Sequence, residues 1–137
     1  MKVLLGTNVI LDFYCKREEF YEYAAAIFDN ACMGEIDLYV SPKSFVDFFY
    51  ITRKDFTIGQ RYEILRGLLE VCRVVTTDEK VIERALSIVM PDFEDMVQMH
   101  SATLAFLDCI VTRNVKDYQI ATIPVMTPKE FINSIKQ

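Results

Sequence analysis

Acidic side chains are the residues of this chain whose types and spacing indicate chemistry. Asp92 and Asp95 are three residues apart in a stretch with helical spacing, so they share one face of the predicted helix. Asp117 follows in a polar segment after the apolar run 109–112. Carboxylates that converge with nothing basic between them repel one another, and a hard divalent cation such as Mg²⁺ is the usual reason to keep them. Such a metal site can activate water for attack on a phosphate.

Alternating strands and helices must bring these acids together. Short apolar runs predict strands at 3–5, 38–40, 73–75, 109–112 and near 123–125. Helical spacing fills the stretches between them, which implies parallel pairing, right-handed crossovers and helices on both faces. We therefore predict an α/β fold, a three-layer αβα sandwich with a central, mainly parallel sheet of four to five strands, as one domain over residues 1–137.

The carboxyl ends of parallel strands lie on one edge of a sheet, so residues that follow different strands meet there. That edge collects Gly6 after the first predicted strand and Asp117 after the fourth. The helix that starts at Asp92 precedes the fourth strand and can bring its own first turn to the same edge. The acids are therefore expected to converge although they are distant in sequence.

Small polar residues mark where the helices begin. The predicted N-caps of four helices are Ser41, Thr57, Thr77 and Thr127. Thr7 or Asn8 is the predicted cap of the first helix, and Gly34 is predicted to end the second. Asp12, within the first helix, is expected on the helix surface.

Composition narrows the function classes. The formal net charge of −5 argues against wholesale coating of nucleic acid, although it allows a local basic rim around an acidic pocket. The apolar runs are too short to cross a bilayer, and no signal-peptide pattern is present, so we expect a cytoplasmic protein. Four scattered cysteines and one histidine indicate buried thiols and no zinc site.

Three segments, taken together and in order, resemble a known family. VLLGTNVILD, DFEDMVQMHSA and IVTRNVKDY followed by IPVMTP are similar to the PIN-domain ribonucleases, in particular the bacterial VapC-like toxins. The resemblance covers essentially the whole chain. It implies a Mg²⁺- or Mn²⁺-dependent endonuclease that cuts single-stranded or looped RNA, and a homodimer or an antitoxin protein as partner. The aromatic segments FVDFFY and YEYAAAIF are the expected partner surface.

The resemblance also assigns site residues by position. The aspartate of the family's opening D-T-N motif aligns with Gly6, the third acidic residue with Asp95 and the fourth with Asp117. The second, a glutamate in many members, falls on Asp47. The hydroxyl and amide residues that lie beside the metal in the family match Asn8, Thr112 and Asn114. Gly6 offers no ligand atom, so we expect a native-like fold with impaired catalysis.

Several of these residues have a plainer interpretation. Asp92 either supports the metal ligands or caps its helix, because acidic residues suit the first helical turn in any protein. Asp47 is a metal ligand, a hydrogen-bond acceptor that supports the ligands without touching the metal, or a carboxylate that faces solvent. Arg113 and Lys116 either contact RNA phosphates or belong to a solvated turn.

Three function hypotheses follow. The first is a metal-dependent ribonuclease impaired at position 6. The second is a catalytically inactive PIN-like module that binds RNA or a protein. A phosphoacceptor receiver domain would share the sheet but needs an acidic pair after the first strand, and Gly6 and Thr7 do not supply one.

Overall fold

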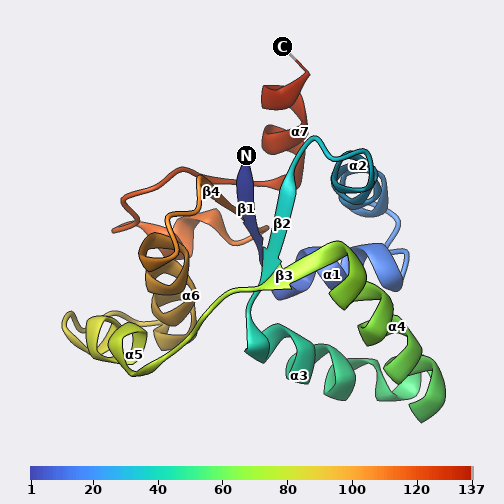
Figure 1. The fold of residues 1–137 in the computed structure, drawn as a ribbon, viewed down its shortest axis with the longest axis horizontal. Coiled ribbons are helices and arrows are strands. Elements are labelled where there is room, and N and C mark those ends of the chain that lie inside the picture. The colour runs from blue at the N-terminus through green and yellow to red at the C-terminus, as the bar shows by residue number, and fades with distance from the viewer. Residues whose placement is uncertain (137) are drawn as a thin grey trace.

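The computed structural model describes residues 1–136 and contains one parallel sheet over that range (Figure 1). The strand order is β3-β2-β1-β4-β5, and every pair of neighbours is parallel. The strands are β1 (Lys2–Leu5), β2 (Asp37–Val40), β3 (Cys72–Val74), β4 (Cys109–Val111) and β5 (Val125–Met126). The predicted architecture and strand number are confirmed, with the last strand lying slightly later than expected.

Helices cover both faces of this sheet. The α-helices are α1 (Thr7–Tyr14), α2 (Tyr21–Cys32), α3 (Pro42–Ile51), α4 (Ile58–Val71), α5 (Glu79–Leu86), α6 (Phe93–Leu104) and α7 (Pro128–Ile135). Short 3₁₀ turns form η1 (Thr52–Lys54) and η2 (Val115–Tyr118). Figure 1 shows α5 and α6 on one side of the strands and α2 and α4 on the other.

Successive side chains of β1 point to opposite faces of the sheet, which explains why helices form a layer on each side of it. Val3 and Leu5 point into a core shared with α1, α2, α3, α4 and α7, where Phe48 and Phe131 are fully buried. Leu4 points the opposite way, into a second core with α5, α6 and η2. Side chains on a strand alternate between faces, so the central strand supplies both cores. The carboxyl ends of β1 and β4 are thereby fixed side by side.

Most of the predicted caps are confirmed. Ser41, Thr57 and Thr127 each accept a hydrogen bond from the backbone N–H three residues on. Gly34, with φ 77, follows the last residue of α2 as predicted for a glycine at a helix end.

Two predicted caps are wrong. The cap of α5 is Asp78, because the hydroxyl of Thr77 lies 3.0 Å from the Ser101 hydroxyl and is therefore engaged elsewhere. The cap of α1 is Gly6, with no side-chain hydrogen bond, because Thr7 is already the first helical residue.

The cysteines follow the prediction in part. All of them are free, and Cys72 and Cys109 are buried as expected. Cys32 is exposed at the end of α2, which contradicts the prediction of a buried thiol there. Within residues 1–136, no helix combines the length and the apolar character that crossing a bilayer requires.

Candidate metal centre

The predicted acids meet at the carboxyl end of the sheet. Asp92, Asp95 and Asp117 each offer a carboxylate oxygen, and these oxygens all lie within 4.8 Å of one another. We call these residues the acidic cluster. Asp92 is also the N-cap of α6, since its Oδ1 accepts a hydrogen bond from the Asp95 backbone N–H at 3.0 Å. Its two interpretations from sequence, capping and membership of the site, are therefore compatible.

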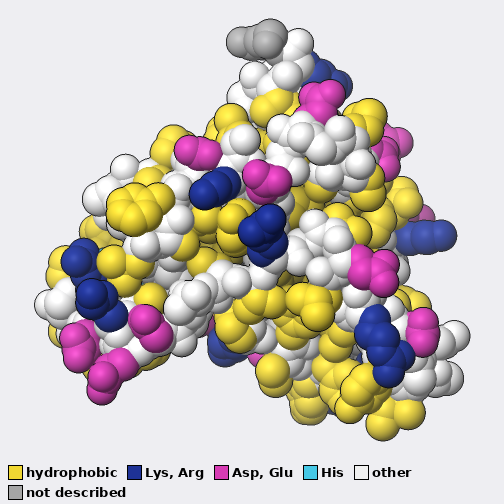
Figure 2. Space-filling view, viewed as in Figure 1, with side chains coloured by type: hydrophobic (Ala, Val, Ile, Leu, Met, Phe, Trp, Pro, Cys, Tyr) yellow, Lys and Arg dark blue, Asp and Glu magenta, His cyan; other side chains and the backbone are white. Residues whose placement is uncertain are grey.

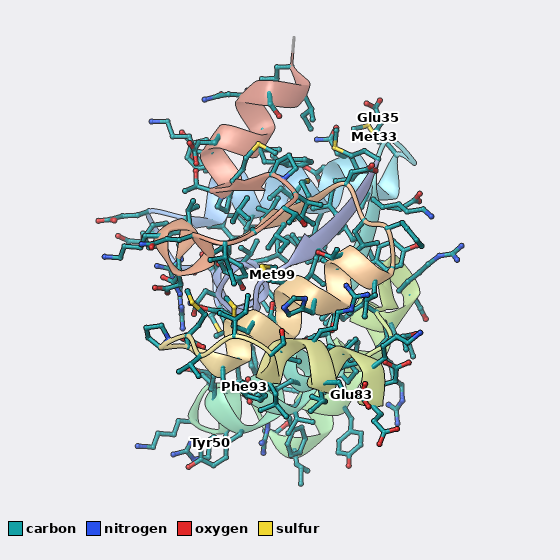
Figure 3. All side chains as sticks on the ribbon, turned by 90° about the vertical axis from the view of Figure 1, so that its left-hand side faces the viewer. Met33, Glu35, Tyr50, Glu83, Phe93 and Met99 are labelled. Atoms are coloured by element: carbon teal, nitrogen blue, oxygen red, sulfur yellow. The ribbon has the colours of Figure 1, made fainter. Side chains whose placement is uncertain are left out.

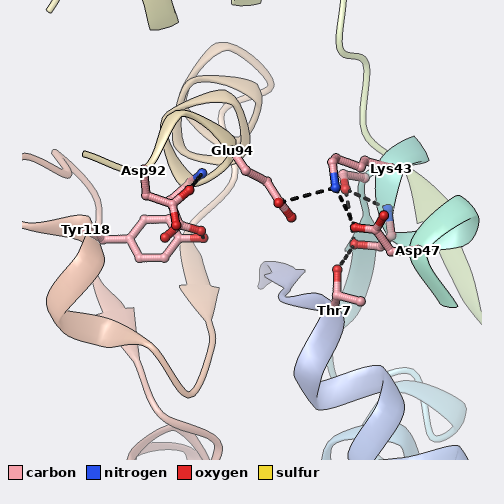
Figure 4. A network of polar contacts seen from close by, with 9 residues as sticks. Thr7, Lys43, Asp47, Asp92, Glu94 and Tyr118 are labelled. Carbon is pink, nitrogen blue, oxygen red and sulfur yellow. Dashed lines mark hydrogen bonds and ion pairs between the residues drawn. The ribbon is translucent and has the colours of Figure 1, made fainter. Parts of the chain in front are cut away.

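Asp95 is the most perturbed member of the acidic cluster. Burial raises the pKa of its carboxyl to about 6, and the nearby Asp92 charge adds to this effect. The Tyr118 hydroxyl donates a hydrogen bond to Asp95 Oδ1 at 3.1 Å, which partly opposes the rise in pKa. Figure 4 shows the Tyr118 ring beside Asp92 at the start of α6. A hard cation, which prefers oxygen ligands, would relieve the mutual repulsion of these carboxylates.

Gly6 directly follows β1 and is hydrogen-bonded to the neighbouring strand β4. Its N–H donates to the Val111 carbonyl at 2.9 Å, and its backbone is extended, with φ −72 and ψ 155. Any residue adopts that conformation, so the backbone does not require glycine here. A Cβ at position 6 would lie 3.1 Å from Thr112 Oγ1 and 3.3 Å from Thr112 Cβ. A larger residue therefore needs Thr112 to shift by a few tenths of an ångström.

Asp47 is held outside the acidic cluster. Lys43 Nζ lies 2.7 Å from Asp47 Oδ2 on the same helix, and 3.2 Å from Glu94 Oε2 on α6. Figure 4 shows Lys43 reaching between these two carboxylates. The acidic edge is therefore divided into the three clustered aspartates and two carboxylates, Asp47 and Glu94, that share the Lys43 ammonium.

Hydroxyl groups connect the ends of β1 and β2. Thr7 Oγ1 lies 2.7 Å from the buried Ser44 Oγ, which in turn lies 3.1 Å from Ser41 Oγ. This chain of hydrogen bonds ties the first turn of α1 to the first turn of α3 (Figure 4). Asn8 is half-buried in the same turn of α1.

The loop after β4 carries the remaining predicted residues. Thr112 is buried, and its hydroxyl accepts a hydrogen bond from the Asn114 N–H at 3.2 Å, while the rest of Asn114 is exposed. Lys116 is exposed and lines a small hollow of about 130 Å³ together with Asp92 and Asp117. Lys116 therefore lies next to the acidic cluster.

Arg113 points away from the acidic cluster into a buried ion pair. Its Nε lies 2.9 Å from Asp12 Oδ2, and Nη2 donates to Asp12 Oδ1 at 3.3 Å. The guanidinium also covers the Phe20 ring at 4.0 Å. Asp12 is fully buried, so the expectation that it lies on the helix surface is wrong. Its carboxylate also faces Arg17, at 3.5 Å.

Sequence reasoning missed two residues of this region, Lys43 and Tyr118, and one contact, between Asp12 and Arg113. Lys43 could have been found from its spacing to Asp47, because residues four apart are neighbours on a helix. Tyr118 follows Asp117 directly, but the direction of its hydroxyl depends on the 3₁₀ turn. The Asp12 and Arg113 pair spans 101 residues and leaves no local signal.

Comparison with known proteins places the chain in a family. The PIN domain profile matches residues 2–116, so the chain belongs to the PIN domain family. A comparison with curated protein sequences found no match.

Solved structures share the fold. VapBC-1 from nontypeable Haemophilus influenzae matches with a TM-score of 0.68 and 15% identity, covering 94% of this chain and 99% of that one. A toxin-antitoxin complex from Klebsiella pneumoniae gives 0.67 and 20%, covering 92% and 97%. VapBC2 from Rickettsia felis, bound to a DNA fragment from the promoter, gives 0.62 and 15%, covering 92% and 97%. At these identities the likeness concerns the fold.

Proposed function

We propose that this chain has the scaffold of a Mg²⁺- or Mn²⁺-dependent endoribonuclease that cuts single-stranded or looped RNA, with cleavage weakened by Gly6. The acidic cluster carries the proposal, because three carboxylates within 4.8 Å are a ligand set suited to a hard cation. Membership of the PIN domain family supports it. The acidic cluster is also where the parallel topology gathers the carboxyl ends of strands.

Each residue has a role in this proposal. Asp95 and Asp117 hold the metal, and Asp92 completes the set while it caps α6. When bound, the metal supplies an activated water and stabilises charge on the phosphate. Tyr118 fixes the orientation of Asp95 through its hydrogen bond. Lys116, exposed beside Asp117, contacts RNA phosphate.

Gly6 explains why cleavage is expected to be weak. The family resemblance puts an aspartate at this position, and glycine removes both a negative charge and a ligand atom. Missing one ligand changes the geometry in which water and phosphate meet, and errors of about 1 Å can cost about 100-fold in rate. Asp47 cannot substitute readily, because Lys43 already neutralises it at 2.7 Å.

The test is the substitution Gly6→Asp, assayed for cleavage of a single-stranded RNA with Mg²⁺, Mn²⁺ or EDTA. We expect cleavage at least about 100-fold above the unmodified chain, lost in EDTA. Gly6→Asn is the matched control, since it has the same size and no charge. The double variant Gly6→Asp with Thr112→Ala removes the hydroxyl oxygen that would lie 3.1 Å from the new Cβ. Failure of both aspartate variants to bind metal or cut RNA would overturn the proposal.

A second function is favoured by Gly6 and Lys43 together. A chain that lacks one carboxylate and neutralises two others with lysine is suited to binding without cleavage. In that case Asp95→Asn and Asp117→Asn would leave the effect of the chain on growth of an expressing bacterium unchanged. A ribonuclease predicts that the same substitutions abolish the effect.

Of the two segments expected to form the partner surface, YEYAAAIF in α2 has none of the exposed large apolar side chains, so the proposed surface lies on α3 and α4 instead. The FVDFFY segment exposes Val46 and Tyr50, whereas its Phe48 is fully buried. Neighbouring exposed residues on α4 are Ile58, Tyr62 and Leu69. We call these five residues the α3–α4 apolar surface, and Figure 2 shows hydrophobic side chains gathered at the lower right, over these helices. We propose that this surface contacts a second copy of the chain or an antitoxin.

A further inference from the structure

A second cavity, of about 380 Å³, lies beside the metal centre. Its walls come from the start of α3, from α5 and from the first two turns of α6. It is lined mainly by apolar atoms but contains a few polar groups, which is typical of small-molecule pockets. Neither the metal chemistry nor the fold accounts for it.

Gln98 is the distinctive polar residue of this cavity. Its side chain is only 5% exposed, and among residues 1–136 its Oε1 has no hydrogen-bond partner. A buried amide oxygen without a partner is costly, which indicates a ligand that completes its hydrogen bonding. An amide side chain offers a donor and an acceptor in one plane, the arrangement that recognises a nucleobase edge.

Phe93 provides an aromatic wall. This first residue of α6 is 45% exposed, although it lines the cavity together with Ile82 and Val97. Figure 3 labels Phe93 at the end of α6 that faces α3. An accessible ring above an apolar floor is the usual platform on which an unstacked RNA base is held.

Lys43 and Glu94 connect the cavity to the acidic cluster. Both line the cavity, and their ion pair of 3.2 Å spans its rim. Glu94 immediately precedes Asp95, and Gln98 follows Asp95 by three residues on the same helix. Asp95 and Gln98 are therefore neighbours on one face of α6, which places the cavity next to the acidic cluster. A phosphate at Lys43 would take the place of the Glu94 carboxylate, which lies 3.2 Å from the ammonium.

We propose that this cavity binds a nucleobase of the RNA strand, stacked on Phe93 and hydrogen-bonded by Gln98, with the adjoining phosphate on Lys43. The inference rests on the proposed function, because it names a subsite for the same substrate. The unpartnered Gln98 amide and the aromatic wall of Phe93 favour a nucleobase over an apolar segment of a partner protein.

Nucleotide titration of the unmodified chain tests the proposal directly. Without metal, AMP, GMP, CMP and UMP are added separately, and backbone amide shifts are followed by NMR. We expect at least one nucleotide to shift the signals of Phe93, Val97 and Gln98 saturably, while ribose 5-phosphate, which lacks a base, leaves them unchanged. Equal shifts with ribose 5-phosphate, or no shift with any nucleotide, would overturn the proposal.

Matched variants separate stacking from general effects. Phe93→Ala is expected to weaken binding of the preferred nucleotide about tenfold. Phe106→Ala, which removes another exposed ring beyond the far end of α6, should leave the affinity unchanged. Gln98→Leu keeps the approximate size and is expected to reduce the preference among the four bases. Equal losses in both phenylalanine variants would contradict a base site at Phe93.

The outcomes also distinguish this inference from the proposed function. Cleavage by the Gly6→Asp variant depends on metal, whereas the nucleotide titration is performed without metal. Metal-dependent cleavage with no base-dependent shift at Phe93 would reject the subsite alone. A base-dependent shift with no cleavage in any variant would reject the nuclease and leave a nucleotide-binding pocket.

Discussion

At the scale of single residues, the acidic cluster stores electrostatic repulsion in the folded chain. Burial and the Asp92 charge raise the pKa of Asp95 from its ordinary value of 3.8 to about 6. Between these two pH values the folded chain holds a proton that the unfolded chain releases. Stability from this group is therefore present at low pH and is lost as pH rises through about 6. A bound cation would offset the repulsion among the charged carboxylates and so restore the stability that is lost above about pH 6.

The stability of the metal-free chain falls as pH rises, whereas its affinity for metal should increase. Mn²⁺ must displace the proton of Asp95, so its affinity is expected to rise between pH 5 and pH 7. Isothermal titration calorimetry at several pH values measures the affinity and the released proton together. Asp95→Asn should abolish the dependence. An affinity that stays flat from pH 5 to 7 would contradict the raised pKa.

Tyr118 provides a milder change at the same carboxylate. Tyr118→Phe keeps the buried ring and removes the hydroxyl that donates to Asp95 at 3.1 Å. Because this hydrogen bond favours the charged carboxylate, its loss should raise the pKa of Asp95 further. We expect Mn²⁺ affinity at pH 6 to fall about tenfold, the usual scale for a hydrogen bond to a charged group. The same variant should bind Mn²⁺ nearly normally at pH 8, and a loss equal at both pH values would indicate damaged packing instead.

At the scale of elements, the Asp12 and Arg113 ion pair joins α1 to the loop between β4 and η2, directly before the 3₁₀ turn that carries Asp117. Asp12 is fully buried and a quarter of the Arg113 side chain is exposed. Removing one partner of a buried pair typically costs about 3–5 kcal/mol, and less where water reaches the site. The pair therefore positions the β4–η2 loop against the first helix.

Arg113→Met tests this connection, because methionine keeps much of the packing on Phe20 and removes the charge. We expect the free energy of unfolding, measured in urea, to fall by about 2–3 kcal/mol. Lys116→Met, in the adjoining 3₁₀ turn η2 and exposed, should change the free energy of unfolding by less than about 0.5 kcal/mol. If both variants unfold at the same urea concentration, the ion pair does not stabilise the loop.

Elements were more predictable than side-chain directions. The strands can be predicted from apolar periodicity. Three helix starts can be predicted from Ser41, Thr57 and Thr127, because each caps its helix by a hydrogen bond to the backbone only three residues away. The meeting of Asp95 with Asp117 follows from the common edge of parallel strands. Arg113 could not be placed, because its orientation depends on Asp12, 101 residues away. Lys43 was overlooked although its spacing to Asp47 is local.

At the scale of the whole molecule, the α3–α4 apolar surface belongs to helices that Figure 1 shows to the right of α5 and α6. Tyr62→Glu places a charge where apolar contact is expected, so a homodimer should dissociate. Light scattering coupled to size-exclusion chromatography measures the mass of each form. Phe106→Glu, a comparable change at a position 86% exposed, is the control. A chain that is monomeric before the change would exclude this surface as a homodimer contact and leave the antitoxin as its partner.

The extended backbone at Gly6 has a consequence for the history of the protein. Nothing in that conformation is reserved for glycine, and codons for glycine and aspartate can differ at a single base. A carboxylate could therefore be introduced at the end of the central strand without rebuilding any helix or turn, provided that Thr112 gives way slightly. If the proposed function is right, a single mutation at position 6 would thus separate an inert copy of this fold from an active one.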